Sequence, residues 1–255
     1  MLLDTHCHLT YDIDKDGGVD AVIARAHAAG VDVIICPTAD PGDIDAAIKL
    51  AEKYPNVFAT IGIHPEHAGV RAADYITDEI LNHPRVLGVG EIGLDYHEMD
   101  MDTRAAQIEL FESQLEMARR NKLPVAIHTR DAEEDTAAIL EKWADIGGVM
   151  HCFTSGWGLA KKMLDRGFFF SASGIITFKN AGDIRETFSK IPLERIVVET
   201  DAPYCAPVPY RGRVCEPAFV VETARVVAEI KNIPFDKFCD IVVENTKKLY
   251  PKIKI

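Results

Sequence analysis

The chain has 255 residues, of which 47% are hydrophobic, and carries 40 acidic against 28 basic side chains. This length is enough to bury a full hydrophobic core, and we expect a single domain over residues 1–255. The longest apolar runs fall far short of the ~18 residues of a membrane span. The N-terminal residues lack the pattern of a signal peptide, so we expect a cytoplasmic protein without membrane attachment. The net charge of −12 disfavours a broad nucleic-acid-binding face but leaves room for a small basic site.

Short apolar runs alternate with amphipathic stretches along the whole chain. In chain order, we expect strands at Leu2–Thr5, Val31–Cys36, Val57–Ile61, Val86–Gly90, Pro124–Ile127, Gly148–Met150, Phe168–Ser171 and Arg195–Val198. Their Val, Ile, Leu and Phe content is typical of strands covered on both faces. Apolar spacings near three and four predict helices at Gly18–Ala29, Pro41–Lys53, Tyr75–Asn82, Thr103–Asn121, Ala132–Lys142, Leu159–Arg166, Asp183–Lys190, Pro217–Ile230 and Pro234–Tyr250.

This alternation predicts the α/β class and a (β/α)8 TIM barrel with an extra C-terminal helix. The alternative is an open, doubly wound sheet, which more often has a glycine-rich phosphate loop after its first strand. Here the first strand is followed by His6-Cys7-His8, which favours the barrel. Functional groups of such barrels lie at the C-terminal ends of the strands, so the unusual polar residues should gather there.

The first predicted strand ends in Asp4-Thr5-His6-Cys7-His8. Because residues two apart in an extended segment face the same side, Asp4, His6 and His8 are expected to converge. Two imidazoles on one side form a typical metal-binding pair. A lone histidine is more often a surface or core residue, so this prediction depends on the pair.

Further ligand-type side chains follow five other predicted strands: His64, Glu91, His128, His151, and Glu199 with Asp201. Glu91 lies between glycines and aliphatic residues, where an unpaired buried carboxylate would be costly and a cation would remove that cost. Asp95 is a weaker candidate with a supporting role.

Five histidines with two or three acids suit Zn, Mn, Fe, Ni or Co, and Mg more weakly. The number of these candidate ligands exceeds the three protein ligands of a mononuclear catalytic zinc site. Two metals that share a bridging carboxylate, ~3.5–4 Å apart, use these ligands better and activate water.

At these residues the chain resembles the TatD family of metal-dependent deoxyribonucleases, within the amidohydrolase-like barrels. The matching segments are Asp4-Thr5-His6-Cys7-His8, Gly62-Ile63-His64-Pro65, Gly90-Glu91-Ile92-Gly93-Leu94-Asp95-Tyr96, His128-Thr129-Arg130, His151-Cys152-Phe153 and Glu199-Thr200-Asp201-Ala202-Pro203. They occur in the family's order and cover the whole chain.

The resemblance implies a role for each matching residue. One metal would be held by His6, His8 and Asp201, and the other by His128 and His151, with Glu91 as the bridge between them. The implied cofactors are two divalent ions, Mg, Mn or Zn. Asp201, Glu91 and His64 are the implied catalytic residues, and His64 and Arg130 the implied substrate contacts. Arg130 suits a phosphate, and its alternative is a salt bridge with Asp131 or Glu133 at the rim.

One segment departs from the family pattern, because Cys215 precedes Glu216-Pro217 where asparagine is usual. A thiol poorly replaces an amide, so a hydrogen-bonding role at 215 is in doubt, but not the metal site. The six cysteines form no Cys-x-x-Cys pair, so we expect reduced thiols, with Cys36 and Cys239 as small core residues.

The resemblance implies a deoxyribonuclease, a 3′-5′ exonuclease that cleaves phosphodiesters of single-stranded DNA through a two-metal-activated water. The acidic charge agrees with short or single-stranded ends as substrate rather than long duplex. Arg211 and Arg213 are further candidates to balance phosphate charge, and no obligate protein partner is evident. Five aromatic residues near strand ends are candidates for base stacking or for rim packing: Tyr96, Phe153, Trp157, Phe178 and Tyr204. The alternative function is a small-molecule amidohydrolase acting on an amide, ester or lactone, because fold does not fix substrate.

Overall fold

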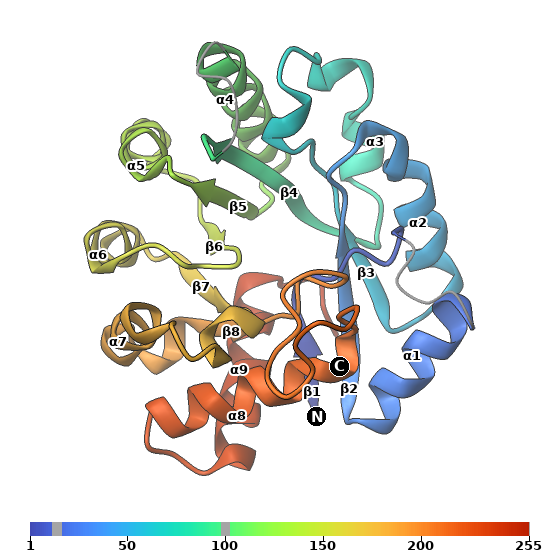
Figure 1. Cartoon of the computed structure of the whole chain (residues 1–255). Helices are drawn as coiled ribbons and strands as arrows, with labels where there is room; N and C mark the ends of the chain where they lie inside the picture. Colours follow the sequence, from blue (N-terminus) through green and yellow to red (C-terminus); the bar gives the residue numbers. More distant parts are fainter. Residues whose placement is uncertain (12–16, 98–102, 255) are drawn as a thin grey trace.

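The computed structural model describes residues 1–11, 17–97 and 103–254. Eight parallel strands follow one another round a single sheet in chain order (Figure 1). They are β1 (Leu2–Asp4), β2 (Val31–Pro37), β3 (Val57–Thr60), β4 (Val86–Asp95), β5 (Val125–Arg130), β6 (Gly148–Met150), β7 (Phe169–Ala172) and β8 (Ile196–Val198). The last strand meets the first through a parallel Cys7–Ala202 bridge and a Thr5 N–H to Val198 carbonyl hydrogen bond of 3.1 Å. The predicted (β/α)8 barrel is therefore confirmed.

Helices surround the strands as an outer ring (Figure 1). They are α1 (Gly18–Ala28), α2 (Ile44–Lys53), α3 (Asp78–Leu81), α4 (Arg104–Asn121), α5 (Glu133–Lys142), α6 (Trp157–Asp165), α7 (Gly182–Lys190), α8 (Val220–Ile230) and α9 (Phe235–Leu249). Within the described ranges, each predicted strand and helix is present, including the extra C-terminal helix. In that part of the chain, no helix combines the length and the apolarity that crossing a membrane requires.

Three predicted boundaries were wrong in ways that affect the local structure: the start of one helix and the ends of two strands. The helix expected over Tyr75–Asn82 begins only at Asp78, because the Thr77 hydroxyl accepts a hydrogen bond from the Ile80 N–H and caps the helix there. Strands β4 and β5 run to Asp95 and Arg130, since they stay paired over their C-terminal halves. Glu91 and His128 therefore lie inside strands rather than after them.

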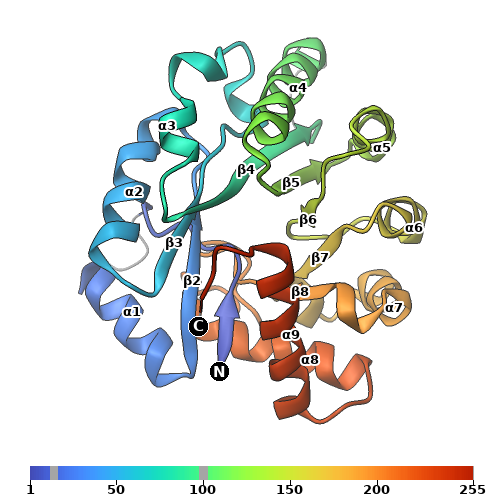
Figure 2. The ribbon, with the colours of Figure 1, turned by 180° about the vertical axis from the view of Figure 1, so that it is seen from behind.

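Alternate residues of the strands pack into two separate apolar layers, as the pleat of a strand requires. One set, including Leu2 and Ile34, packs outward in the main core with the helices. The other set fills the inside of the barrel at its N-terminal end, together with residues of α9 and of the C-terminal tail. Its members are Leu3, Val33, Ile35, Phe58, Leu87, Ala126, Val149, Phe169, Val197, Val243, Leu249, Tyr250 and Ile253. Figure 2 shows α9 on the side nearer the viewer, next to β1 and β8, where it covers this end of the barrel.

Candidate metal centre

His6 and His8 follow β1 and point their rings at the same place. Their Nε2 atoms lie 3.3 Å apart, and each is 3.9 or 3.7 Å from Oδ1 of Asp201, which follows β8. Both histidines are nearly fully buried. Two imidazole nitrogens that face each other and a carboxylate at this spacing form one set of ligands around a common point.

Glu91 lies between this set and a second one. Its Oε2 is 3.4 Å from His6 Nε2 and 3.6 Å from His8 Nε2. Its Oε1 is 2.9 Å from His128 Nδ1 and 3.2 Å from His151 Nε2. One carboxylate thus directs each of its oxygens at a different pair of histidines, which is the arrangement of a bridging ligand.

The donor set fits divalent metal ions. Neutral imidazole and ionised carboxylate are the forms that bind a metal. Burial lowers the pKa of His8 to about 3, helped by the neighbouring His6, so its ring is neutral at physiological pH. Burial alone would raise the pKa of Glu91, but His151 and the hydrogen bonds from His128 and His151 bring it well below its ordinary value. The buried carboxylate is therefore ionised, as a metal bridge requires. Although burial opposes both shifts, Asp95 and Glu91 raise the pKa of His128 to about 9, and Glu199 and Glu91 raise that of His151, so a metal would displace a proton from each of these two rings.

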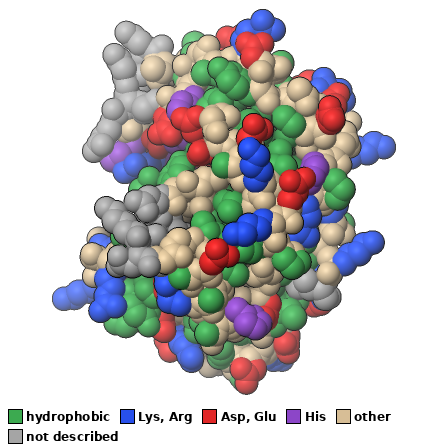
Figure 3. Space-filling view, turned by 90° about the vertical axis from the view of Figure 1, so that its right-hand side faces the viewer, with side chains coloured by type: hydrophobic (Ala, Val, Ile, Leu, Met, Phe, Trp, Pro, Cys, Tyr) green, Lys and Arg blue, Asp and Glu red, His purple; other side chains and the backbone are tan. Residues whose placement is uncertain are grey.

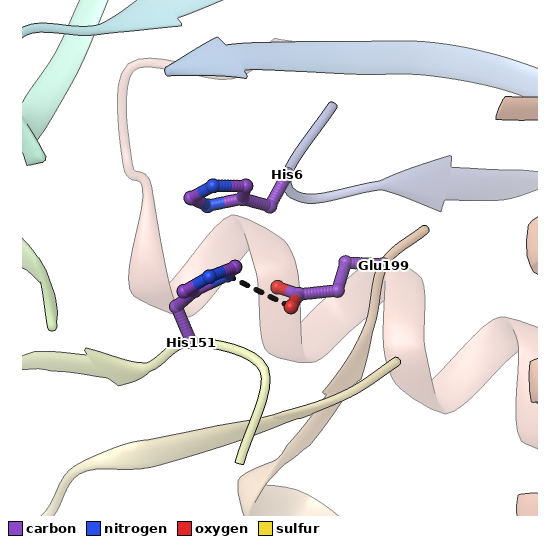
Figure 4. A group of neighbouring side chains, drawn as sticks. All are labelled: His6, His151 and Glu199. Atoms are coloured by element: carbon purple, nitrogen blue, oxygen red, sulfur yellow. Dashed lines mark ion pairs between the residues drawn. The ribbon is translucent and has the colours of Figure 1, made fainter. Parts of the chain in front are cut away.

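Each histidine of the second set has a further carboxylate behind it. Oε1 of Glu199 lies 2.8 Å from His151 Nδ1, and Oδ2 of Asp95 lies 2.9 Å from His128 Nε2. Figure 4 shows the His6 and His151 rings stacked, with the Glu199 carboxylate directed at the edge of the His151 ring; the ring centroids are 3.6 Å apart. Such outer carboxylates orient a ligating ring and strengthen it as a ligand.

The neighbouring strands come unusually close together around Glu91. The register between β4 and β5 shifts between Val89 and Ile92, a bulge that reorients side chains. A Cβ on Gly62 would lie 2.6 Å from the Gly90 carbonyl carbon, and one on Gly90 would lie 2.6 Å from the Ala126 Cβ. Because positions 62 and 90 are glycine, the segment after β3 can pack closely against β4, and β4 against β5. This close packing brings Glu91 beside the histidines.

His64 lies at the edge of the centre. Its Nδ1 accepts a hydrogen bond from the Glu66 N–H, which leaves Nε2 directed inward, 3.8 Å from Oε1 of Glu91. Its ring centroid is 4.5 Å from that of His128. His64 is therefore close enough to contact a substrate held at the centre.

Asp4 does not join the ligands, so the expected convergence of Asp4 with His6 and His8 was wrong. Its carboxylate accepts hydrogen bonds from the Thr200 N–H, the Thr200 hydroxyl and the His6 N–H. Strand β1 ends at Asp4, so the two-residue alternation of an extended strand does not continue into the histidines. Through these hydrogen bonds Asp4, the last residue of β1, instead holds the end of β1 against the segment that follows β8.

Arg130 ends β5 as an exposed residue beside the centre. Neither expected salt bridge forms, because Asp131 pairs with His97 and Glu133 accepts a hydrogen bond from Ser155. Within the part of the chain described, no hydrogen bond or ion pair engages the Arg130 guanidinium.

The aromatic candidates separate by exposure. Tyr204 is 57% exposed and lies edge-on to Tyr11, whose ring stacks on His8 at 4.7 Å. Phe153 is a buried core residue. Phe178 lies under Arg211, whose guanidinium carbon is 3.7 Å from the ring centroid.

The sequence pointed to Glu199 as a ligand-type residue and to Asp95 as a supporting one, but it did not assign either of them a histidine partner. Both lie in the matched segments, and Glu199 is two residues before Asp201. Their contacts with His151 and His128 join different strands, so only the folded barrel reveals them.

The comparisons with known proteins agree with this geometry. The family profile described as TatD related DNase matches residues 3–251. The chain is 38% identical to the metal-dependent hydrolase YabD of Bacillus subtilis over 98% of this chain and 99% of the relative. It is also 38% identical to the metal-dependent hydrolase YcfH of Escherichia coli K12, over 98% and 96%.

A crystal structure of YjjV, a TatD homologue of Escherichia coli K12, superposes with a TM-score of 0.86 and 29% identity, covering 98% of both chains. A TatD family hydrolase of Entamoeba histolytica has the same fold, with a TM-score of 0.86 at 24% identity over 99% of this chain and 98% of that one. The chain is a metal-dependent hydrolase and belongs to the TatD family.

Proposed function

We propose that this hydrolase cleaves phosphodiester bonds of DNA and removes nucleotides from the 3′ ends of single strands. The observation that carries the proposal is the position of Glu91, with one oxygen directed at His6 and His8 and the other at His128 and His151. Two ligand sets joined by one carboxylate suit a pair of metals, and such pairs are typical of phosphodiester hydrolysis.

In this proposal His6, His8 and Asp201 hold one divalent ion, His128 and His151 hold the other, and Glu91 lies between them. When bound, the ions would supply Lewis acidity toward the phosphate oxygens and lower the pKa of water. Mg, Mn and Zn are the candidates, and the mixed nitrogen and oxygen donors favour the latter two.

Asp201 is the proposed proton acceptor. Burial raises its pKa above the ordinary value although His151 and His6 oppose the change. Its place beside both sets of histidines would allow it to orient the attacking water or to accept a proton from it. His64, with Nε2 directed inward, is placed to contact the phosphate or the leaving oxygen.

The rim offers contacts for a nucleic-acid end rather than for a long duplex. Arg130 presents a guanidinium that suits a phosphate, and Tyr204 beside Tyr11 presents an aromatic surface for a base. Figure 3 shows the side of the molecule that lies to the right in Figure 1, where acidic and basic side chains are interspersed without a continuous basic patch. This side of the helical ring therefore lacks the basic surface that a long duplex would need.

The test is incubation of the purified protein with 5′-labelled single-stranded DNA in Mg²⁺ or Mn²⁺, beside the Asp201→Asn variant. We expect a ladder that shortens from the 3′ end with the wild type and no ladder with the variant. Intact DNA with a metal-loaded wild-type protein would refute the proposal and favour a carbonyl or small phosphoester substrate.

Arg130→Ala separates phosphodiesters from the alternative amide, ester and lactone substrates. If the substrate is a phosphodiester, the variant should lose about tenfold or more in kcat/KM, because a charge-assisted contact contributes roughly 1.5–3 kcal/mol. Arg71→Ala, an exposed arginine paired with Asp74, is the matched control and should change nothing. Equal kinetics of Arg130→Ala and wild type on DNA would contradict the assigned contact.

A further inference from the structure

Two half-buried thiols lie beside the metal centre and have no part in the proposed reaction. Cys152 follows β6, directly after His151, and Cys205 lies in the loop after β8. The neighbouring Cys205 thiol raises the pKa of the Cys152 thiol, so the two groups lie close together. The Cys205 Sγ lies 3.6 Å from Oδ2 of Asp201, and Cys152 Sγ, His151 and Asp201 place ligand atoms within 4.8 Å of one another.

Asp201 divides its two oxygens between the histidines and the thiols. Its Oδ1 lies 3.7–3.9 Å from the Nε2 atoms of His6, His8 and His151. Its Oδ2 is the oxygen that Cys205 approaches. A ligand bound by the thiols would therefore reach the side of Asp201 that the histidines leave open.

The spacing of these atoms suits a tetrahedral ion. Thiolate sulfur at ~2.3 Å and carboxylate oxygen at ~2.0 Å from tetrahedral zinc lie ~3.5 Å apart. The observed 3.6 Å between Cys205 Sγ and Asp201 Oδ2 matches that value. The Ser173 hydroxyl, which accepts a hydrogen bond from Cys152 Sγ at 3.1 Å, provides one more oxygen at the same place.

We propose that Cys152, Cys205 and Oδ2 of Asp201 form an additional binding site for one thiophilic cation of the Zn²⁺ or Cd²⁺ type. Thiolates select such soft ions over Mg²⁺ or Mn²⁺, so the site is chemically distinct from the His and carboxylate centre. Each thiol releases one proton to solvent when it binds the ion. Occupation engages the second oxygen of Asp201 and adds positive charge beside it, so the ion inhibits hydrolysis.

The other thiols provide internal controls. Cys7, Cys36 and Cys215 are fully buried, and Cys239 is a buried residue of α9, which covers the opposite end of the barrel. Access therefore favours the pair beside Asp201.

The experiment titrates the full-length protein with Cd²⁺ in excess Mg²⁺ and a phosphine reductant. Thiolate-to-cadmium charge-transfer absorption in the ultraviolet reports the site without any substrate, so its result is independent of the proposed nuclease activity. Because Cd²⁺ also binds imidazole and carboxylate, the titration continues past the two ions of the centre, and we expect it to give the thiolate band in the wild type and in Cys239→Ser. We expect the band to be lost in the Cys152→Ser/Cys205→Ser double variant.

A double variant that keeps the band, or a wild type without one, would overturn the proposal. Cys205→Ser alone serves if the double variant fails to fold, because Cys205 is a partly exposed loop residue. It should also lose most of the band, whereas an unchanged band would count against the site.

Discussion

The same strands contribute apolar side chains to one end of the barrel interior and ionisable side chains to the other end. On β4, Leu87 belongs to the apolar layer at the N-terminal end, and Glu91 bridges the histidines at the other. On β5, Ala126 lies in the apolar layer, and His128 two residues later contacts Glu91. The inward face changes from hydrocarbon to imidazole and carboxylate side chains within one or two alternations of the strand.

The contrast separates what holds the fold from what performs chemistry. The apolar end buries aliphatic and aromatic side chains, so substitutions there should act on the free energy of unfolding. The polar end groups ionisable side chains, so substitutions there should act on metal binding and catalysis.

The largest effect is expected for Glu91→Gln at the polar end. Replacing the shared carboxylate should lower kcat/KM by at least ~10³-fold, about 4 kcal/mol of transition-state stabilisation. Steady-state kinetics of the Mn²⁺-loaded protein and its metal content would measure this effect. A variant that keeps both its metal and its activity would remove Glu91 from the centre.

Tyr250→Ala is the corresponding change at the apolar end. Tyr250 is 1% exposed and fills the interior below the strands, so truncation should cost about 3–5 kcal/mol of unfolding free energy. At a temperature where the variant stays folded, kcat should match the wild type. Urea unfolding and kinetics on the same sample would test both parts.

Tyr250→Phe is the matched control for that truncation. Within the described residues, the Tyr250 hydroxyl is buried without a hydrogen-bond partner, so its removal should leave stability unchanged or raise it. A loss comparable to that of Tyr250→Ala would indicate an unrecognised polar contact at this end of the barrel.

A smaller effect is expected for Glu199→Gln, which keeps the shape but weakens the partner of His151 Nδ1. Outer carboxylates of this kind typically contribute 10–100-fold in metal affinity or activity. We expect a weaker apparent Mn²⁺ affinity in calorimetry, with kcat partly restored at high Mn²⁺. Activity that falls equally at every Mn²⁺ concentration would point to a role other than orienting the histidine.

The smallest effect is expected for Tyr204→Ala at the rim. Stacking of one base on an aromatic side chain typically contributes ~1–3 kcal/mol of binding free energy. Its loss should therefore raise KM for single-stranded DNA about fivefold or more. A small diester without a base should show no change. Equal effects on both substrates would refute the stacking role.

Much of this molecule could be predicted from local sequence patterns. The alternation of apolar runs and helical spacings predicts the barrel, and the histidine and acidic residues near the strand ends mark one rim. Leu87 and Val197, for example, lie in apolar runs that predict buried strands, and both are buried in the strands.

What local patterns missed depends on long-range contacts. Pairing with β5 extends β4 past Glu91. Asp4 bonds to Thr200 nearly two hundred residues away, and Glu199 finds His151 on another strand. None of these partners is specified by neighbouring residues in the chain.

The most direct test of the central claim is a count of metal ions at the polar end. Mn²⁺ titration followed by electron paramagnetic resonance should give two ions per chain with a spin-coupled signal, because one carboxylate joins the two ligand sets. Glu91→Gln should lose that coupled signal. A single uncoupled ion in the wild type would contradict the account.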